Sequence, residues 1–151
     1  MPHFMIVTSP YYEDVSNFLL DGTKAYFDEN HATYEVFEVP GALEIPLAVK
    51  LGIADSINNG TKPLKYDGFV ALGCVIRGET SHYDIVCNES ARGLSQLALE
   101  FDMPIGNAIL TCENMEQAIV RADPKQKNKG RDAAQAVLKM YEMKRDFHIT
   151  E

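Results

Sequence analysis

One nine-residue run, Gly68–Ile76, constrains the fold of this 151-residue chain more than any other feature. It reads GFVALGCVI and is apolar at consecutive positions rather than at alternate ones. A strand that is apolar on both faces is typical of the middle of a parallel sheet with helices packed on each side. The run therefore predicts a buried central strand in an α/β protein.

Strand and helix patterns alternate on both sides of this run. Short apolar runs predict three more strands, over residues 4–7, 33–39 and 104–111. Apolar residues at helical spacing predict the intervening helices, one of them marked by Leu43, Leu47, Leu51, Ala54 and Ile57. A polar loop is predicted over residues 58–63. The pattern predicts an α/β fold, a three-layer α-β-α sandwich with a central, mostly parallel four-stranded sheet like that of flavodoxin. Residues 1–151 are expected to form a single domain.

Composition excludes several classes of protein. The chain has 22 acidic and 14 basic side chains and a net charge of −8, whereas nucleic-acid binders carry a basic surplus. No apolar run approaches the roughly 18 residues of a membrane span, and no secretory signal is expected at the N-terminus. Three widely spaced cysteines without a C-x-x-C pair indicate reduced thiols and a cytoplasmic location, with a catalytic Cys74 as the alternative.

The loop that follows the central strand is the most informative segment for function. Parallel sheets of this kind bind ligands outside the carboxyl ends of their strands. The loop reads Arg-Gly-Glu-Thr-Ser-His over residues 77–82 and opens the next helix. Free N–H groups at a helix start, which Gly78 leaves accessible, form an anion site, and His82 beside it could transfer protons near neutral pH. The alternative is that His82 only caps the helix or fills space.

Other loops at the same edge of the sheet offer binding groups. Gly41 and Ala42 permit close backbone approach, and Glu44 could accept hydrogen bonds from a polyol or merely complement the helix dipole. Tyr11 and Tyr12, after the first strand, offer an aromatic face. Arg121 and Lys129, which bracket the loop 124–128, could reach a phosphate or be solvated. No group of His, Cys and carboxylates has the spacing of metal ligands, so no metal site is expected.

These same segments resemble the lumazine synthase family. The similarity is carried by residues 39–46 (VPGALEIP), 72–84 (LGCVIRGETSHYD), 87–93 (CNESARG), 104–114 and 128–130, in collinear order over nearly the whole chain. The resemblance implies condensation of 5-amino-6-(D-ribitylamino)uracil with 3,4-dihydroxy-2-butanone 4-phosphate, with release of phosphate and water. It implies small-molecule substrates and neither a metal nor an organic cofactor.

The resemblance also implies roles for individual residues. His82 would transfer protons during imine formation and loss of phosphate. Gly78, Glu79 and Thr80 would cradle the phosphate, with Arg121 as its charged clamp. The remaining substrate contacts would come from Tyr11 or Tyr12 by stacking on the pyrimidine, from Gly41, Ala42 and Glu44 along the ribityl chain, from Cys74, Val75 and Ile76 around the ring, and from Asn107 and Lys129 of a neighbouring subunit.

Some features depart from the family pattern, and two of them bear on the site and the assembly. Asn107 stands where several members have an aromatic residue, and the loop 123–127 lacks the glycines of members that build icosahedral shells. We therefore expect a homo-oligomer, with a pentamer favoured over a decamer and a decamer over a 60-subunit shell. Two other functions stay open from the sequence: a protein that binds a flavin or lumazine without turnover, and an oligomeric scaffold.

Overall fold

The computed structural model describes residues 1–58 and 64–149. Four strands lie within these residues: β1 (His3–Thr8), β2 (Thr33–Glu38), β3 (Gly68–Ile76) and β4 (Ile105–Cys112). The described helices are α1 (Glu13–Glu29), α2 (Ile45–Asn58), α3 (His82–Phe101), α4 (Met115–Ala122) and α5 (Lys129–Asp146), with a short 3-10 helix, η1 (Ala42–Glu44), before α2. The loop predicted over residues 58–63 lies outside the described residues except for its first residue, which ends α2.

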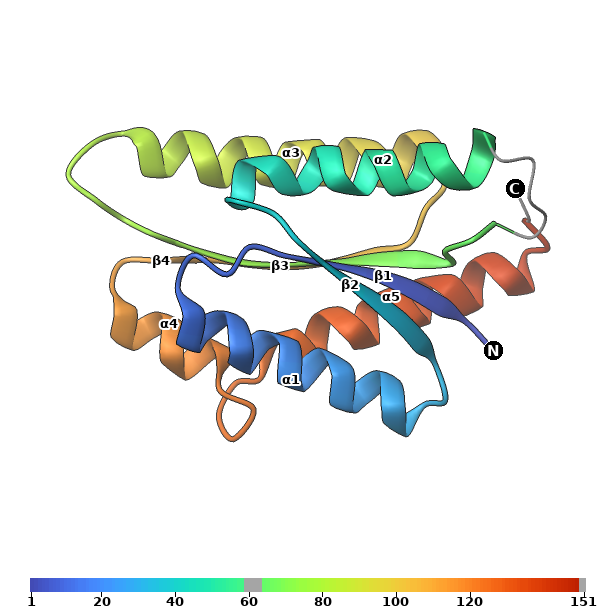
Figure 1. Ribbon diagram of the computed structural model, residues 1–151, viewed down its shortest axis with the longest axis horizontal. Helices are drawn as coiled ribbons and strands as arrows, with labels where there is room; N and C mark the ends of the chain where they lie inside the picture. The colour runs from blue at the N-terminus through green and yellow to red at the C-terminus, as the bar shows by residue number, and fades with distance from the viewer. Residues whose placement is uncertain (59–63, 150–151) are drawn as a thin grey trace.

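The strands form one parallel sheet in the order β2-β1-β3-β4. Helices α2 and α3 cover one face, and α1, α4 and α5 cover the other (Figure 1). The predicted three-layer α-β-α architecture is therefore confirmed, with a sheet that is parallel throughout. The strand order changes direction between β1 and β3, which is the point where open α/β sheets bind their ligands.

Successive side chains of each central strand point alternately into two separate hydrophobic cores. On β3, Phe69 and Ala71 pack toward α2 and α3, whereas Val70 and Leu72 pack toward α1, α4 and α5. All four are fully buried. This two-sided burial explains why the run Gly68–Ile76 is apolar at consecutive positions, as the sequence predicted.

Two glycines let α5 approach its neighbours closely. A Cβ on Gly106 of β4 would lie 2.2 Å from the carbonyl oxygen of Ala133 in α5. A Cβ on Gly130, in the first turn of α5, would lie 2.1 Å from the carbonyl oxygen of Leu19 in α1. Since both contacts are with backbone, no side-chain rotation could relieve them. The position of α5 against the sheet and against α1 therefore depends on these glycines.

None of the described helices combines the length and the apolar character that crossing a membrane requires.

Candidate active site at the carboxyl ends of the strands

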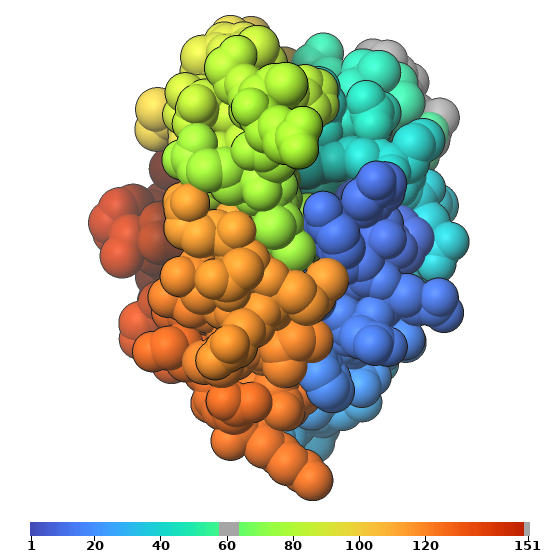
Figure 2. Space-filling model, turned by 90° about the vertical axis from the view of Figure 1, so that its left-hand side faces the viewer, coloured from blue at the N-terminus to red at the C-terminus, as the bar shows by residue number. Residues whose placement is uncertain are grey.

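A cavity of about 460 Å³ lies where the carboxyl ends of β1, β2 and β3 meet. Figure 2 shows this face, with the segments after β1 in blue, after β2 in cyan and after β3 in lime green. Eight of the residues predicted to bind substrate or to act on it line this cavity: Tyr11, Gly41, Ala42, Glu44, Cys74, Val75, Ile76 and His82. Three loops that are far apart in the sequence are thus brought to one place by the parallel sheet.

The two tyrosines after β1 have different environments. Both line the cavity, with their rings edge to face and 4.9 Å apart. Tyr12 is half-buried against the core beneath α1, and this burial raises the pKa of its phenol. Tyr11 is 74% exposed. Of the two rings, Tyr11 is the one with a free face that a planar ligand could cover.

His82 is the first residue of α3 and is exposed at the rim of the cavity. Its backbone N–H donates to the hydroxyl of Thr80 at 3.3 Å, and Ser81 occupies the cap position. Gly78 has open space on the side where a Cβ would lie, with no atom within 4 Å. Because the N-terminal end of a helix carries a partial positive charge, residues 78–81 offer an anion a site directly beside the imidazole.

The turn after β2 forms the opposite wall. A 3.1 Å hydrogen bond from the Glu44 N–H to the Gly41 carbonyl oxygen closes η1 and makes this turn tight. The Glu44 carboxylate folds back over Gly41, so that a Cβ at this position would lie 3.0 Å from its Oε1 atom. A carboxylate held over bare backbone in this way can accept hydrogen bonds from a chain of hydroxyl groups.

Six of the predicted site residues do not line the cavity among the residues that the structure describes: Gly78, Glu79 and Thr80, in the loop before α3, and Asn107, Arg121 and Lys129. Asn107 lies midway along the edge strand β4 and accepts a hydrogen bond from the Ile109 N–H at 2.8 Å. Arg121 donates to the carbonyl oxygen of Gln117 within α4 at 3.1 Å, and Lys129 pairs with Asp132 at 3.3 Å. One chain alone therefore does not collect the whole predicted site.

Comparison with known proteins identifies the family. The sequence model of the 6,7-dimethyl-8-ribityllumazine synthase family matches residues 2–145. The 6,7-dimethyl-8-ribityllumazine synthase of Agrobacterium fabrum is 52% identical over 144 residues, which cover 95% of each chain. The chain belongs to the lumazine synthase family. A synthase of the same name from Zymomonas mobilis is 48% identical, over 96% of this chain and 98% of its own, and the synthase 1 of Rhizobium meliloti is 49% identical, over 94% and 91%.

One residue of the cavity, Val86, was not among the binding residues predicted from the sequence. Val86 lines the cavity from α3 and is buried against the core beneath α2. It follows His82 by four positions and so lies on the same face of the helix. This four-residue spacing was the sequence signal that could have placed Val86 in the cavity. The other lining residues, Ser9, Pro40 and Leu43, belong to the loops already expected at this edge.

Cys74 has the environment of a packing residue rather than a nucleophile. Burial, with the neighbouring Cys112 thiol as a further cause, raises the pKa of Cys74 to about 12. The three cysteines are free thiols. In the described part of the chain, no three His, Cys, Asp or Glu side chains are grouped closely enough to hold a metal ion.

The raised pKa predicts that Cys74 reacts slowly with iodoacetamide. A pKa raised above its ordinary value means that the thiolate, the reactive form, is scarce at pH 8 and appears only as the pH approaches 12. We expect alkylation of the native protein at Cys74 to be about a thousandfold slower than alkylation of the urea-unfolded chain. Mass spectrometry of the peptide that contains Cys74 measures both rates, and equal rates would contradict the packing role.

Proposed function

We propose that this cavity is the active site of a 6,7-dimethyl-8-ribityllumazine synthase, a transferase of riboflavin biosynthesis. The two substrates would be 5-amino-6-(D-ribitylamino)uracil and 3,4-dihydroxy-2-butanone 4-phosphate. The observation that most strongly supports this function is the convergence of eight predicted residues on one cavity, in a chain that matches this family from residue 2 to residue 145.

The cavity has a wall suited to each part of the pyrimidine substrate. The free face of Tyr11 would stack on the ring. Val75 and Ile76 also line the cavity and would contact the ring, and the Glu44 carboxylate over Gly41 would accept hydrogen bonds from the ribityl hydroxyls. Ala42, next to Gly41, is buried, and its small side chain would let the ligand approach this wall closely.

The phosphate of the second substrate would bind at the N-terminal end of α3. Gly78, Glu79 and Thr80 would surround it with backbone N–H groups, and the helix dipole favours an anion at this place. His82 lies in the first turn of α3 and would therefore stand beside both the phosphate and the ketone.

His82 would act by proton transfer while the amine of the pyrimidine attacks the ketone. Loss of water gives an imine, departure of phosphate follows, and attack of the ribitylamino nitrogen on the remaining carbonyl, with loss of a second water, closes the ring. Each step moves a proton, which an imidazole can accept and return. The substrate amine is itself the nucleophile. Holding the two reactants side by side would therefore supply much of the acceleration, on the order of 7–11 kcal/mol in favourable cases.

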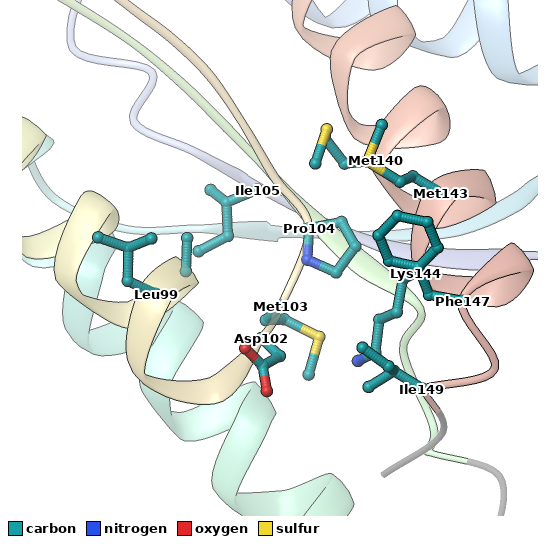
Figure 3. A pocket seen from close by; sticks show the side chains of 11 residues that line it. Leu99, Asp102, Met103, Pro104, Ile105, Met140, Met143, Lys144, Phe147 and Ile149 are labelled. Atoms are coloured by element: carbon teal, nitrogen blue, oxygen red, sulfur yellow. The ribbon is translucent and has the colours of Figure 1, made fainter.

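We propose that Asn107, Arg121 and Lys129 complete the site from a neighbouring copy of the chain, because none of them lines the cavity and the Arg121 and Lys129 side chains are engaged within α4 and α5 of their own chain. Exposed apolar side chains favour such an assembly. Leu47 and Leu51 on α2 are 61% and 60% exposed. A second cavity, of about 350 Å³, lies between α3 and α5 at the start of β4 (Figure 3). Leu99, Met143 and Phe147 are among the residues that line it. Apolar surface of this kind is typical of subunit interfaces.

A free pentamer is the assembly that we propose. Light scattering should give a mass of about 85 kDa, five times the 16.9 kDa of one chain. Substitution of both exposed leucines, Leu47→Glu with Leu51→Glu, should lower this mass because two charges would enter the proposed interface. A mass of one chain for the unmodified protein would contradict the shared site, whereas ten or sixty chains would contradict only the pentamer.

A two-substrate turnover assay tests the function itself. The absorbance of lumazine and the release of phosphate are followed together and compared with the slow uncatalysed mixture. Equal amounts of both products, formed well above that background, are expected. If the protein bound the ligand without turnover, its function would instead be to bind a flavin or lumazine. If it assembled without binding the ligand, it would be a scaffold. We place the protein in the cytoplasm, a proposal that the three free thiols support.

A further inference from the structure

Arg77 occupies the junction between the central strand and the loop that carries His82. It is the first residue after β3, and its backbone N–H continues the ladder by donating to the carbonyl oxygen of Cys112 at 2.9 Å. The next four residues form the loop, and α3 begins at His82. Any restraint on the Arg77 side chain therefore acts at the base of this loop.

The Arg77 side chain contacts the first turn of α3, where the loop ends, and the segment that follows β4. Its Nε atom donates to both carboxylate oxygens of Glu113, which follows β4, at 2.9 and 3.2 Å. Its Nη1 atom lies 3.6 Å from the carboxylate of Asp84, and the guanidinium group lies over the ring of Tyr83, 4.3 Å from its centre. Asp84 and Tyr83 belong to the first turn of α3, immediately after His82.

Glu113 is in turn fixed to the next helix. Its backbone N–H donates to the side-chain oxygen of Gln117 in α4 at 2.8 Å. One planar cation thus joins the end of β3, the segment after β4 and the first turn of α3. Arginine is suited to this task because its guanidinium group can bind a carboxylate and stack on a ring at the same time.

We propose that Arg77 is a positioning residue for His82: it ties the first turn of α3 to the ends of β3 and β4 and so sets where the imidazole and the phosphate-binding loop lie. This inference rests on the proposed function for its catalytic consequence. The restraint itself is a property of the fold. A displacement of about 1 Å at a reacting group costs up to about 100-fold in rate, so a small relaxation of the turn has a measurable effect.

The test compares Arg77→Gln with a matched control, Arg92→Gln. Arg92 also makes a short ion pair on α3, 2.7 Å from Glu89, and it is similarly exposed, at 63% against 42% for Arg77. It does not line the cavity. Arg77→Gln should lower kcat about 10- to 100-fold, with KM for either substrate changing less than kcat. Arg92→Gln should leave kcat unchanged. Both melting temperatures should fall by at most about a few degrees because exposed ion pairs stabilise little.

Two further variants separate positioning from simple charge. Arg77→Lys keeps the cation but loses the two-oxygen contact with Glu113, so it should recover little of the lost kcat. Glu113→Gln should lower kcat as well, and the double variant Arg77→Gln with Glu113→Gln should lose no more than Arg77→Gln alone. Full recovery in Arg77→Lys, or an effect confined to KM of the phosphate-bearing substrate, would overturn the proposal in favour of direct phosphate attraction.

Hydrogen exchange supplies a readout that does not depend on turnover. Amides of residues 78–86 should exchange faster in Arg77→Gln than in the unmodified protein, and Arg92→Gln should not change them. Unchanged exchange in Arg77→Gln would overturn the positioning role even if kcat fell. If the unmodified protein had no synthase activity, the proposed function would fail, and the exchange comparison would still decide whether Arg77 holds the loop.

Discussion

Replacement of His82 by alanine is expected to slow lumazine formation about 10²- to 10⁴-fold without abolishing it, which is the range typical of a lost general acid–base group. The residual rate would come from the cavity itself, which still holds the two reactants in contact. Steady-state turnover with both substrates saturating, corrected for the uncatalysed reaction, measures this loss.

The control for His82→Ala is another exposed histidine, His31, in the loop between α1 and β2. Asparagine suits its left-handed backbone, with φ at 59°, so His31→Asn should leave both stability and turnover unchanged. Retention of full turnover in His82→Ala would remove the proton-transfer role. Equal losses in the two variants would point to a general effect on the fold.

Substitution of Gly106 by alanine is expected to lower the free energy of unfolding by about 3 kcal/mol, at the upper end of the usual cost of overpacking. The added methyl group would lie 2.2 Å from the carbonyl oxygen of Ala133, so α5 would have to move away from β4. Lys129, at the start of α5, would move with it. Urea unfolding followed by circular dichroism measures the change.

Gly73→Ala is the matched control, since Gly73 lies on β3 and pairs with Ile109 of β4. A Cβ at Gly73 would meet its nearest neighbour, the Ile45 side chain, at 3.4 Å, which is an ordinary contact. Its stability should therefore change by less than about 1 kcal/mol. Equal stability of Gly106→Ala and Gly73→Ala would contradict the close packing of α5 on the sheet.

The sequence predicted the fold because its strongest signal came from the most constrained element. The run Gly68–Ile76 has one arrangement that satisfies both of its apolar faces, a central parallel strand between helical layers. The loops that follow β1, β2 and β3 then had to meet at one edge, which brought Tyr11, Gly41 and His82 to a single cavity. Parallel topology thus determines this part of the candidate site.

The face of α2 that packs on the sheet could not be predicted in the same way. Leu43, Leu47 and Leu51 correctly predict a helical segment, yet their stripe is exposed, and Ile45, Val49 and Ile53 are buried instead. Both stripes are apolar and repeat every four residues, so periodicity alone does not distinguish them. The choice depends on which stripe meets Met5 and Phe69 of the sheet, a contact between distant segments.

Residues that a second copy of the chain would contribute to the site are equally hard to predict from the sequence. Nothing in the local pattern around Asn107, Arg121 or Lys129 says whether the side chain serves its own chain or a neighbour. Their roles were inferred from the family resemblance, and their absence from the cavity lining in the described residues supports a shared site without placing the neighbour. Geometry between subunits depends on the complementarity of whole surfaces.

A crystal structure of the protein with an unreactive analogue of the pyrimidine substrate and inorganic phosphate would test the shared active site most directly. We predict that the analogue lies on the Tyr11 ring with its polyol at Glu44, and that phosphate lies at residues 78–80 beside His82. Asn107, Arg121 and Lys129 should reach both ligands from an adjacent copy. Ligands bound elsewhere, or a cavity that no second copy approaches, would contradict this account.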